Sequence, residues 1–214
     1  MTRICCISDT HSFHRKLEIP ECDILVHSGD ITGHGELGIL DDFCEWLQAL
    51  PVKDIVVIAG NHDFFERGHK RQPALDMLNQ ACHYIEDSSV EIAGLKFHGS
   101  PITPYFFDWS WNRQRGPDIS RHWDLIPDDT DVLVTHGPPM GILDGVPRNW
   151  GDVEHIGCAD LLRHLERLKQ LKLHCFGHCH GGYGHIERNG IHFVNAASCT
   201  EQYRPTNPPI IIDL

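Results

Sequence analysis

The sequence predicts a mixed α/β fold in which strands and helices alternate along the chain. Three observations support this fold: five short apolar runs, two amphipathic segments and two hairpin patterns. The apolar runs are rich in β-branched residues and are bounded by Gly, Asp or Ser, as buried strands usually are. They comprise residues 3–8, 23–28, 54–59, 131–135 and 172–176.

Two segments between these runs carry apolar residues at steps of three and four, the spacing of an amphipathic helix. In residues 36–50 the apolar positions are Leu37, Leu40, Phe43, Leu47 and Leu50, and in residues 158–171 they are Leu161, Leu162, Leu165 and Leu168. The end of each helix leads into the next strand. Units of this kind favour partly parallel sheets.

Two further regions read as β-hairpins. Residues 90–99 turn at Ala93-Gly94, and residues 183–194 turn at Asn189-Gly190. Glycine in a two-residue connection is typical of hairpin turns. Residues 100–117 are the only long stretch with little periodicity. A length of 214 residues suits one domain with a sizeable core, so we expect a single domain over residues 1–214.

Composition narrows the possible partners and compartment. With 18 Lys and Arg against 30 Asp and Glu, the formal charge is -12, which disfavours binding to polymeric nucleic acid. No apolar run approaches the roughly 20 residues that cross a membrane. The nine cysteines contain no C-x-x-C pair and no leader pattern opens the chain, so we expect reduced thiols and a cytoplasmic protein.

The chain contains 17 histidines, and five of them stand in polar clusters that follow the five predicted strands. Ligands of open α/β sheets bind beyond the carboxyl ends of the strands, so these clusters should converge. The clusters are Ser8-Asp9-Thr10-His11, Gly29-Asp30, Gly60-Asn61-His62-Asp63, Thr135-His136-Gly137 and Gly177-His178-Cys179-His180. Each alone is more typical of a turn, but five in this order predict one site.

Imidazole, carboxylate and amide ligands without a thiolate indicate two ions of Mn, Fe or Zn, with Ni also possible. We expect seven ligands, with Asp30 shared by both ions. One ion would bind Asp9, His11, Asp30 and His180, and the other Asp30, Asn61, His136 and His178. Such a pair can generate a bridging hydroxide that attacks phosphorus. His62 is left over from the ligand set, so we expect it to protonate the leaving oxygen as general acid.

These motifs resemble the calcineurin-like metallophosphoesterase superfamily, whose pattern is D-x-H, G-D, G-N-H-[DE], H and G-H-x-H. The chain is most similar to the metallophosphoesterase-domain-containing subfamily of class III cyclic nucleotide phosphodiesterases. The similarity includes residues 24–30, 58–62, 135–141 and 205–214. It implies an α+β fold, a four-layer αββα sandwich with two mixed β-sheets flanked by helices. It also implies hydrolysis of phosphodiesters such as cyclic nucleotides.

One departure from the family pattern concerns the catalytic histidine. Many members of the superfamily carry an acid three residues after the bridging Asp, where it orients that histidine. Here the position is Gly33. We expect Asp63 or Glu36 to take its place. A second comparison favours an active enzyme, because His178 is present where some animal members of the subfamily have Gly.

The aromatic segment 100–116 offers candidates for substrate recognition, since aromatic faces stack on bases and Arg pairs with phosphate. Trp109, Asn112 and Arg113 are the side chains that we expect to contact a nucleotide. The alternative is that the aromatics only fix a long loop to the domain.

Several histidines lie outside the five clusters. We expect His27, His164 and His174 in the core or on the surface, and His14, His34 and His185 close to the site.

The sequence therefore predicts a two-metal phosphoesterase, with a small phosphodiester as the favoured substrate. A phosphomonoesterase with the same site is the first alternative, because the same metal chemistry serves both reactions. The second is a metal-dependent nucleotide-binding or scaffold protein with weak activity, against which the intact His62, His178 and His180 argue.

Overall fold

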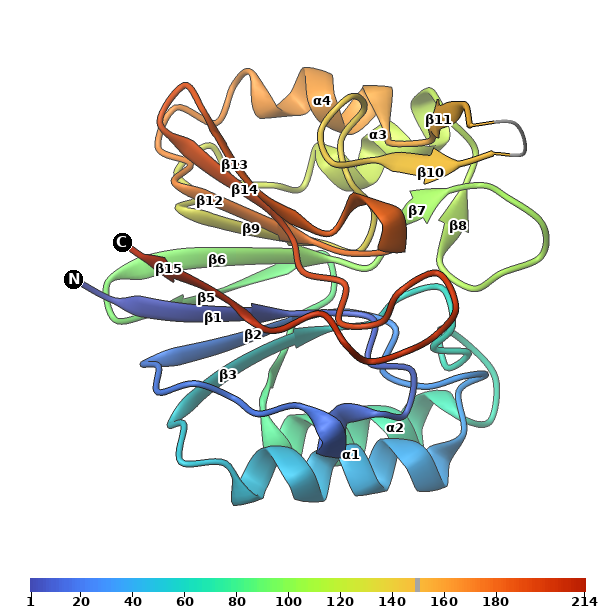
Figure 1. Ribbon diagram of the computed structural model, residues 1–214, viewed down its shortest axis with the longest axis vertical. Coiled ribbons are helices and arrows are strands. Elements are labelled where there is room, and N and C mark those ends of the chain that lie inside the picture. Colours follow the sequence, from blue (N-terminus) through green and yellow to red (C-terminus); the bar gives the residue numbers. More distant parts are fainter. Residues whose placement is uncertain (149–150) are drawn as a thin grey trace.

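The computed structural model describes residues 1–148 and 151–214 and has four layers, with a helix pair on the outer face of each of two packed sheets (Figure 1). Each sheet combines parallel and antiparallel strands. This arrangement confirms the predicted α+β class and the four-layer αββα sandwich with two mixed sheets.

The first sheet has the strand order β15-β1-β2-β3-β4. Strands β1 to β4 run parallel, and the last strand of the chain, β15, pairs antiparallel with β1. Their bounds are Arg3–Ile7 (β1), Ile24–Ser28 (β2), Asp54–Ile58 (β3), His83–Tyr84 (β4) and Ile210–Asp213 (β15). Helices α1 (Leu37–Ala49) and α2 (Arg71–Ala81) lie on its outer face (Figure 1).

The second sheet has the order β13-β14-β12-β9-β6-β5, with a parallel centre and an antiparallel hairpin at each edge. The strands are Ser88–Ile92 (β5), Leu95–Ser100 (β6), Val132–Thr135 (β9), Leu173–Phe176 (β12), Gly184–Arg188 (β13) and Ile191–Asn195 (β14). Helices α3 (Pro117–Trp123) and α4 (Ala159–Leu165) cover the outer face (Figure 1).

Alternate side chains of a strand pack in different parts of the hydrophobic core. In β1, Ile4 and Cys6 pack in the cluster between the two sheets, whereas Cys5 and Ile7 face the opposite way and join the cluster that includes Phe43 of α1. Successive side chains of a strand point to opposite faces, so a strand covered on both sides is apolar throughout. This explains why the predicted strands appear in the sequence as continuous apolar runs.

All five predicted strands and both hairpins are present, and the turns use left-handed backbone at Ala93, Gly94, Asn189 and Gly190. The predicted helix over 36–50 is α1. The predicted helix over 158–171 is shorter, because after Leu165 the backbone hydrogen bonds span only two or three residues. The change produces a series of turns up to Leu171 that keep Leu168 buried.

Four smaller strands complete the architecture, in two pairs near one end of the sheets. They are Thr103–Pro104 (β7) with Asn112–Arg113 (β8), and Gly145–Pro147 (β10) with Val153–His155 (β11). Single helical turns occupy His14–Lys16 (η1) and His180–Gly182 (η2). Every helix that the structure describes falls short of the length and hydrophobicity needed to cross a bilayer.

Candidate metal centre

The five polar clusters converge at the carboxyl ends of strands from both sheets. Asp9 and Asp30 follow β1 and β2 of the first sheet, and Asn61 follows β3. His136 and His178 follow β9 and β12 of the second sheet. The seven predicted ligands are thus brought together from strand ends that are far apart in the chain. The convergence agrees with the position expected for ligand sites in parallel sheets.

One group of donors consists of Asp9, His11 and His180, whose ligand atoms all lie within 4.8 Å of one another. The Nε2 atom of His180 is 3.2 Å from Asp9 Oδ1 and 3.2 Å from Nε2 of His11. Asp30 Oδ2 lies 3.8 Å from His11 Nε2. These four side chains are the set expected for the first ion.

A second group consists of Asp30, His136 and His178, again within 4.8 Å. Asp30 Oδ2 is 3.3 Å from His136 Nε2, which is 2.9 Å from Asn61 Oδ1. Asp30 is therefore the carboxylate that stands next to both groups. Its other oxygen, Oδ1, accepts a hydrogen bond of 2.8 Å from the backbone N–H of His62.

Backbone carbonyls orient two of the imidazoles for metal binding. His136 Nδ1 donates to the carbonyl oxygen of Ser28 at 2.9 Å, and His180 Nδ1 donates to that of Thr200 at 2.9 Å. With Nδ1 bound to a carbonyl, Nε2 is the ring nitrogen that faces the other donors, and a metal ion binding there would displace any proton on it. Metal-binding histidines commonly have such an outer hydrogen bond, which fixes the tautomer and the ring orientation.

The electrostatics of the site suit cations. Burial lowers the pKa of His11 to about 4 and that of His178 to about 3, so both rings are neutral at pH 7, the form that binds metal. Burial also acts on His136, but the charge of Asp30 and the contact with it outweigh burial and raise the pKa of His136 to about 9. The pocket of buried carboxylates thus attracts positive charge. Two divalent ions fit this donor set of oxygen and imidazole ligands.

Two glycines allow the loops to approach this closely. A Cβ atom at Gly177 would collide with the carboxylate of Asp9, and one at Gly60 would collide with the backbone and carboxylate of Asp30. Two of the predicted ligands have left-handed backbone themselves, since Asp9 and Asp30 have φ of 50° and 57°. Non-glycine residues are uncommon in this region, and such strain is frequent at functional sites.

His62 is oriented by the backbone. Its Nδ1 donates to the carbonyl oxygen of Gly33 at 2.8 Å, which leaves Nε2 as the unpaired ring nitrogen. The ring centroid lies 4.6 Å from that of His11 and 4.3 Å from that of the Trp109 side chain. One donor atom of His62 falls within 4.8 Å of those of His11 and Asp30. The imidazole therefore stands at the edge of the first donor group.

We expected Asp63 or Glu36 to orient His62, but the group that contacts the His62 ring is the Gly33 carbonyl. Asp63 is fully buried and accepts hydrogen bonds from the backbone N–H groups of Ile31, Thr32 and Gly60. Glu36 accepts from the N–H groups of Gly33 and His34. Both carboxylates hold the loop that presents the Gly33 carbonyl, so each acts on His62 only through the backbone.

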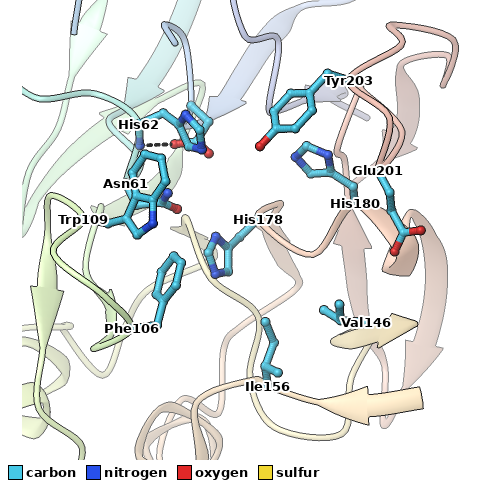
Figure 2. A pocket seen from close by; sticks show the side chains of 11 residues that line it. Asn61, His62, Phe106, Trp109, Val146, Ile156, His178, His180, Glu201 and Tyr203 are labelled. Atoms are coloured by element: carbon cyan, nitrogen blue, oxygen red, sulfur yellow. Dashed lines mark hydrogen bonds between the residues drawn. The ribbon is translucent and has the colours of Figure 1, made fainter. Parts of the chain in front are cut away.

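A cavity of about 300 Å³ opens beside the donor groups (Figure 2). Its wall includes Asp30, Asn61, His62, Phe106, Trp109, Val146, Ile156, His178, His180, Glu201 and Tyr203. Trp109 lies in this wall, and its contact with a nucleotide stays a prediction. Tyr203 and Glu201 were not predicted, because no sequence signal links residues near the carboxyl end to the strand exits. Tyr203 packs edge-on against His11, with centroids 4.8 Å apart.

Asn112 and Arg113 lie outside this wall, and their expected contact with substrate stays a prediction. The Arg113 guanidinium donates to Glu66 at 2.8 Å and to His122 Nε2 at 3.2 Å. Asn112 Nδ2 donates to the carbonyl oxygen of Phe106 at 2.8 Å, and Thr103 Oγ1 donates to Asn112 Oδ1 at 2.9 Å. Asn112 and Arg113 thus anchor the loop that carries Phe106 and Trp109, the structural alternative considered above.

Replacing Trp109 and Arg113 by Ala is expected to give different defects. Trp109→Ala removes a cavity wall that packs on His62, so KM for a nucleotide diester should rise about tenfold, the usual effect of losing one aromatic contact. Arg113→Ala removes the 2.8 Å contact with Oε1 of the partly buried Glu66 and leaves that carboxylate only the Trp111 N–H and Arg67 at its other oxygen, so the melting temperature should fall by several degrees. Steady-state kinetics and thermal unfolding of both variants test this. Identical kinetic and thermal profiles would contradict the assignment.

The histidines outside the five clusters differ from the prediction in which of them lie near the site. His27 is buried in β2 as predicted, yet it supports the site, because its Nδ1 accepts from the Gly29 N–H and its Nε2 lies 3.0 Å from Thr10 Oγ1. His34 does reach the site and lies 6.1 Å from His62 between ring centroids.

Two histidines expected near the site lie elsewhere. His14 contacts Asp42, and His185 pairs with His192 on the outer hairpin. Of the two others expected in the core or on the surface, His174 is buried beside Thr135 and His164 bonds to exposed Asp124.

Comparison with known proteins agrees with this geometry. The calcineurin-like phosphoesterase family profile matches residues 2–182. Human metallophosphoesterase domain-containing protein 1 is 39% identical over 100% of this chain and 71% of its own length. The Caenorhabditis elegans UPF0046 protein C25E10.12 is 41% identical over 99% of this chain and 80% of its own.

Two solved structures share the fold at low sequence identity. A novel archaeal phosphodiesterase aligns with a TM-score of 0.52 and 19% identity over 99% of this chain and 93% of that one. A Thermus thermophilus protein aligns with a TM-score of 0.55 and 12% identity over 91% and 88%. Fold, donor groups and family profile agree, and the chain belongs to the calcineurin-like phosphoesterases, a family of metal-dependent phosphoester hydrolases.

Proposed function

We propose that this protein is a binuclear-metal-dependent phosphodiesterase that acts on small diesters, cyclic nucleotides among them. The observation that carries the proposal is the position of Asp30 between two donor groups, with the free nitrogen of His62 beside one of them. Asp9, His11 and His180 would hold one ion, and Asn61, His136 and His178 the other. When bound, two such ions lower the pKa of water and polarise the phosphoryl oxygens.

His62 is the proton donor in this proposal. The Gly33 carbonyl holds Nδ1, so the ring has a single nitrogen, Nε2, available to a substrate in the cavity. A protonated Nε2 would give its proton to the departing ester oxygen, which stabilises the leaving alkoxide. Trp109 packs on the same ring and limits its rotation. The leaving group would therefore occupy the side of the cavity next to His62 and Trp109.

The charges of the cavity wall favour a diester over a monoester. Among the described residues of the wall there is no Lys or Arg, and Glu201 adds a carboxylate to that of Asp30. A phosphomonoester carries close to two negative charges near neutral pH, whereas a diester carries one. Repulsion by Glu201 therefore costs a monoester more. The apolar part of the wall, with Phe106 and Ile156, suits the organic groups of a diester.

Metal removal and restoration test the proposed activity. The protein stripped by a chelator should be inactive, and addition of Mn²⁺, Fe²⁺, Zn²⁺ or Ni²⁺ should restore hydrolysis of bis-p-nitrophenyl phosphate and of a cyclic nucleotide. We expect kcat/KM for p-nitrophenyl phosphate to be at least about tenfold lower than for the diester, a difference of about 1.4 kcal/mol in transition-state binding.

The alternatives give other outcomes in the same assay. Faster turnover of p-nitrophenyl phosphate would identify a phosphomonoesterase. Metal binding without turnover of any of the three substrates would favour a nucleotide-binding or scaffold protein.

A further inference from the structure

A second cavity of about 330 Å³ adjoins the one at the metal centre. The two cavities share four wall residues, Phe106, Val146, Ile156 and His178. Beyond them, the second cavity is lined by Pro104, Tyr105, Phe107, Arg115, Arg148 and Glu154. Figure 2 shows Phe106, His178, Ile156 and Val146 on one side of the metal cavity, away from Tyr203. The second cavity, hereafter the side lobe, is thus continuous with the proposed active site.

The charged side chains of the side lobe already form contacts within the protein. Arg148 forms an ion pair with Glu154. The Arg115 guanidinium donates to the carbonyl oxygens of Ile156 at 2.8 Å and Gly157 at 2.9 Å. The charges of Arg148 and Glu154 therefore offset each other, whereas Arg115 keeps its positive charge but has two of its N–H groups bound to carbonyl oxygens. The lobe is suited to an apolar group.

Two aromatic side chains at the lobe are unusually exposed. Phe107 is 79% exposed and Tyr105 is 49% exposed. Phe107 also has a left-handed backbone, with φ of 46°. A bulky residue rarely adopts this conformation without a local reason. Phe106 lies 6.2 Å from Phe107 and 5.2 Å from His178 between ring centroids, and with His178 it forms part of the wall that the two cavities share.

We propose that the side lobe binds the retained substituent of a linear phosphodiester, and that this substituent is aromatic or otherwise apolar. The inference rests on the proposed diesterase activity. With phosphorus at the donor groups and the leaving oxygen at His62, the second ester group must point away from His62. His178 and Phe106 mark the way out in that direction, into the lobe.

Linear and cyclic diesters should differ in whether they occupy the side lobe. In a cyclic diester both ester oxygens belong to the same sugar, so one cavity accommodates the whole organic part. A linear diester has two organic groups on different sides of the phosphorus. Only the linear class can fill both cavities, and aromatic contacts in the lobe then add to its affinity.

The test uses two linear diesters with the same leaving group and the full chain loaded with Mn²⁺. Methyl p-nitrophenyl phosphate retains a methyl group, and bis-p-nitrophenyl phosphate retains an aryl group. Combined Tyr105→Ala and Phe107→Ala substitution should raise KM for the aryl substrate about tenfold and leave KM for the methyl substrate unchanged. Leu125→Ala is the matched control, because Leu125 is 55% exposed and outside both cavities.

Calorimetric titration gives a readout that does not need turnover. Diphenyl phosphate should bind the wild-type protein about tenfold more tightly than dimethyl phosphate, and the double variant should lose this preference. Equal changes for aryl and methyl compounds, or no preference in the wild type, would overturn the inference. Loss of all diester hydrolysis with the preference retained would reject the proposed function and leave the lobe as an aryl-binding site.

Discussion

Asp30→Asn is expected to abolish turnover and to release bound metal. The substitution keeps the shape of the side chain but removes the negative charge that stands beside both donor groups. Charge stabilisation by bound ions is worth several kcal/mol, so kcat should fall by about 10³-fold or more. Metal content by mass spectrometry and the rate with bis-p-nitrophenyl phosphate are the two measurements.

Asp76→Asn is the control for this experiment, because Asp76 is an exposed carboxylate on α2 that accepts a hydrogen bond from Gln72 of the same helix. It makes the same chemical change without touching the site. An Asp30→Asn protein with two bound ions and near-normal rate would exclude Asp30 as the shared ligand.

His62→Ala should leave both ions in place and lower the rate by about 10²–10⁴-fold, the usual contribution of a general acid. The defect should depend on the leaving group. Nitrophenolate departs with little protonation, so bis-p-nitrophenyl phosphate should lose less rate than a diester with an alkyl leaving group. A plot of rate against leaving-group pKa for wild type and variant measures this difference.

Loss of metal in the His62→Ala protein would contradict the division of roles proposed for the site. The geometry makes this a strict test, because a donor atom of His62 lies within 4.8 Å of those of His11 and Asp30. An equal loss of rate for all leaving groups would likewise argue for a ligand or a positioning residue.

The sequence was sufficient to predict the strands of the two sheet centres and the convergence of the ligands. Both are encoded locally, by apolar runs that end in Gly, Asp, Asn or His, and parallel strands bring such ends together. Strand β15 was not predicted, and among the described residues it pairs with β1, where Asp213 stands opposite Arg3 at the other end of the chain. Helix α2 was not predicted either, because only Ala74 and Leu78 of its side chains are fully buried.

Side-chain patterns also could not reveal how His62 is oriented. The acceptor is the carbonyl of Gly33, and every residue type has a carbonyl. The same limit applies to Arg113, whose aromatic neighbours suggested a nucleotide contact while its partners, Glu66 and His122, are separated from it in the sequence. Residue types and spacing identify the chemistry-bearing residues, and tertiary contacts decide which of them face the cavity.

Because the predicted ligands follow strands of two different sheets, bound metal would crosslink the sheets. Asp30 follows a strand of the first sheet, and His136 and His178 follow strands of the second. An ion held by all three would connect the two sheets. The free energy of metal binding would then add to the free energy of unfolding. Cellular metal supply would then govern not only how fast the protein works but also how long it stays folded.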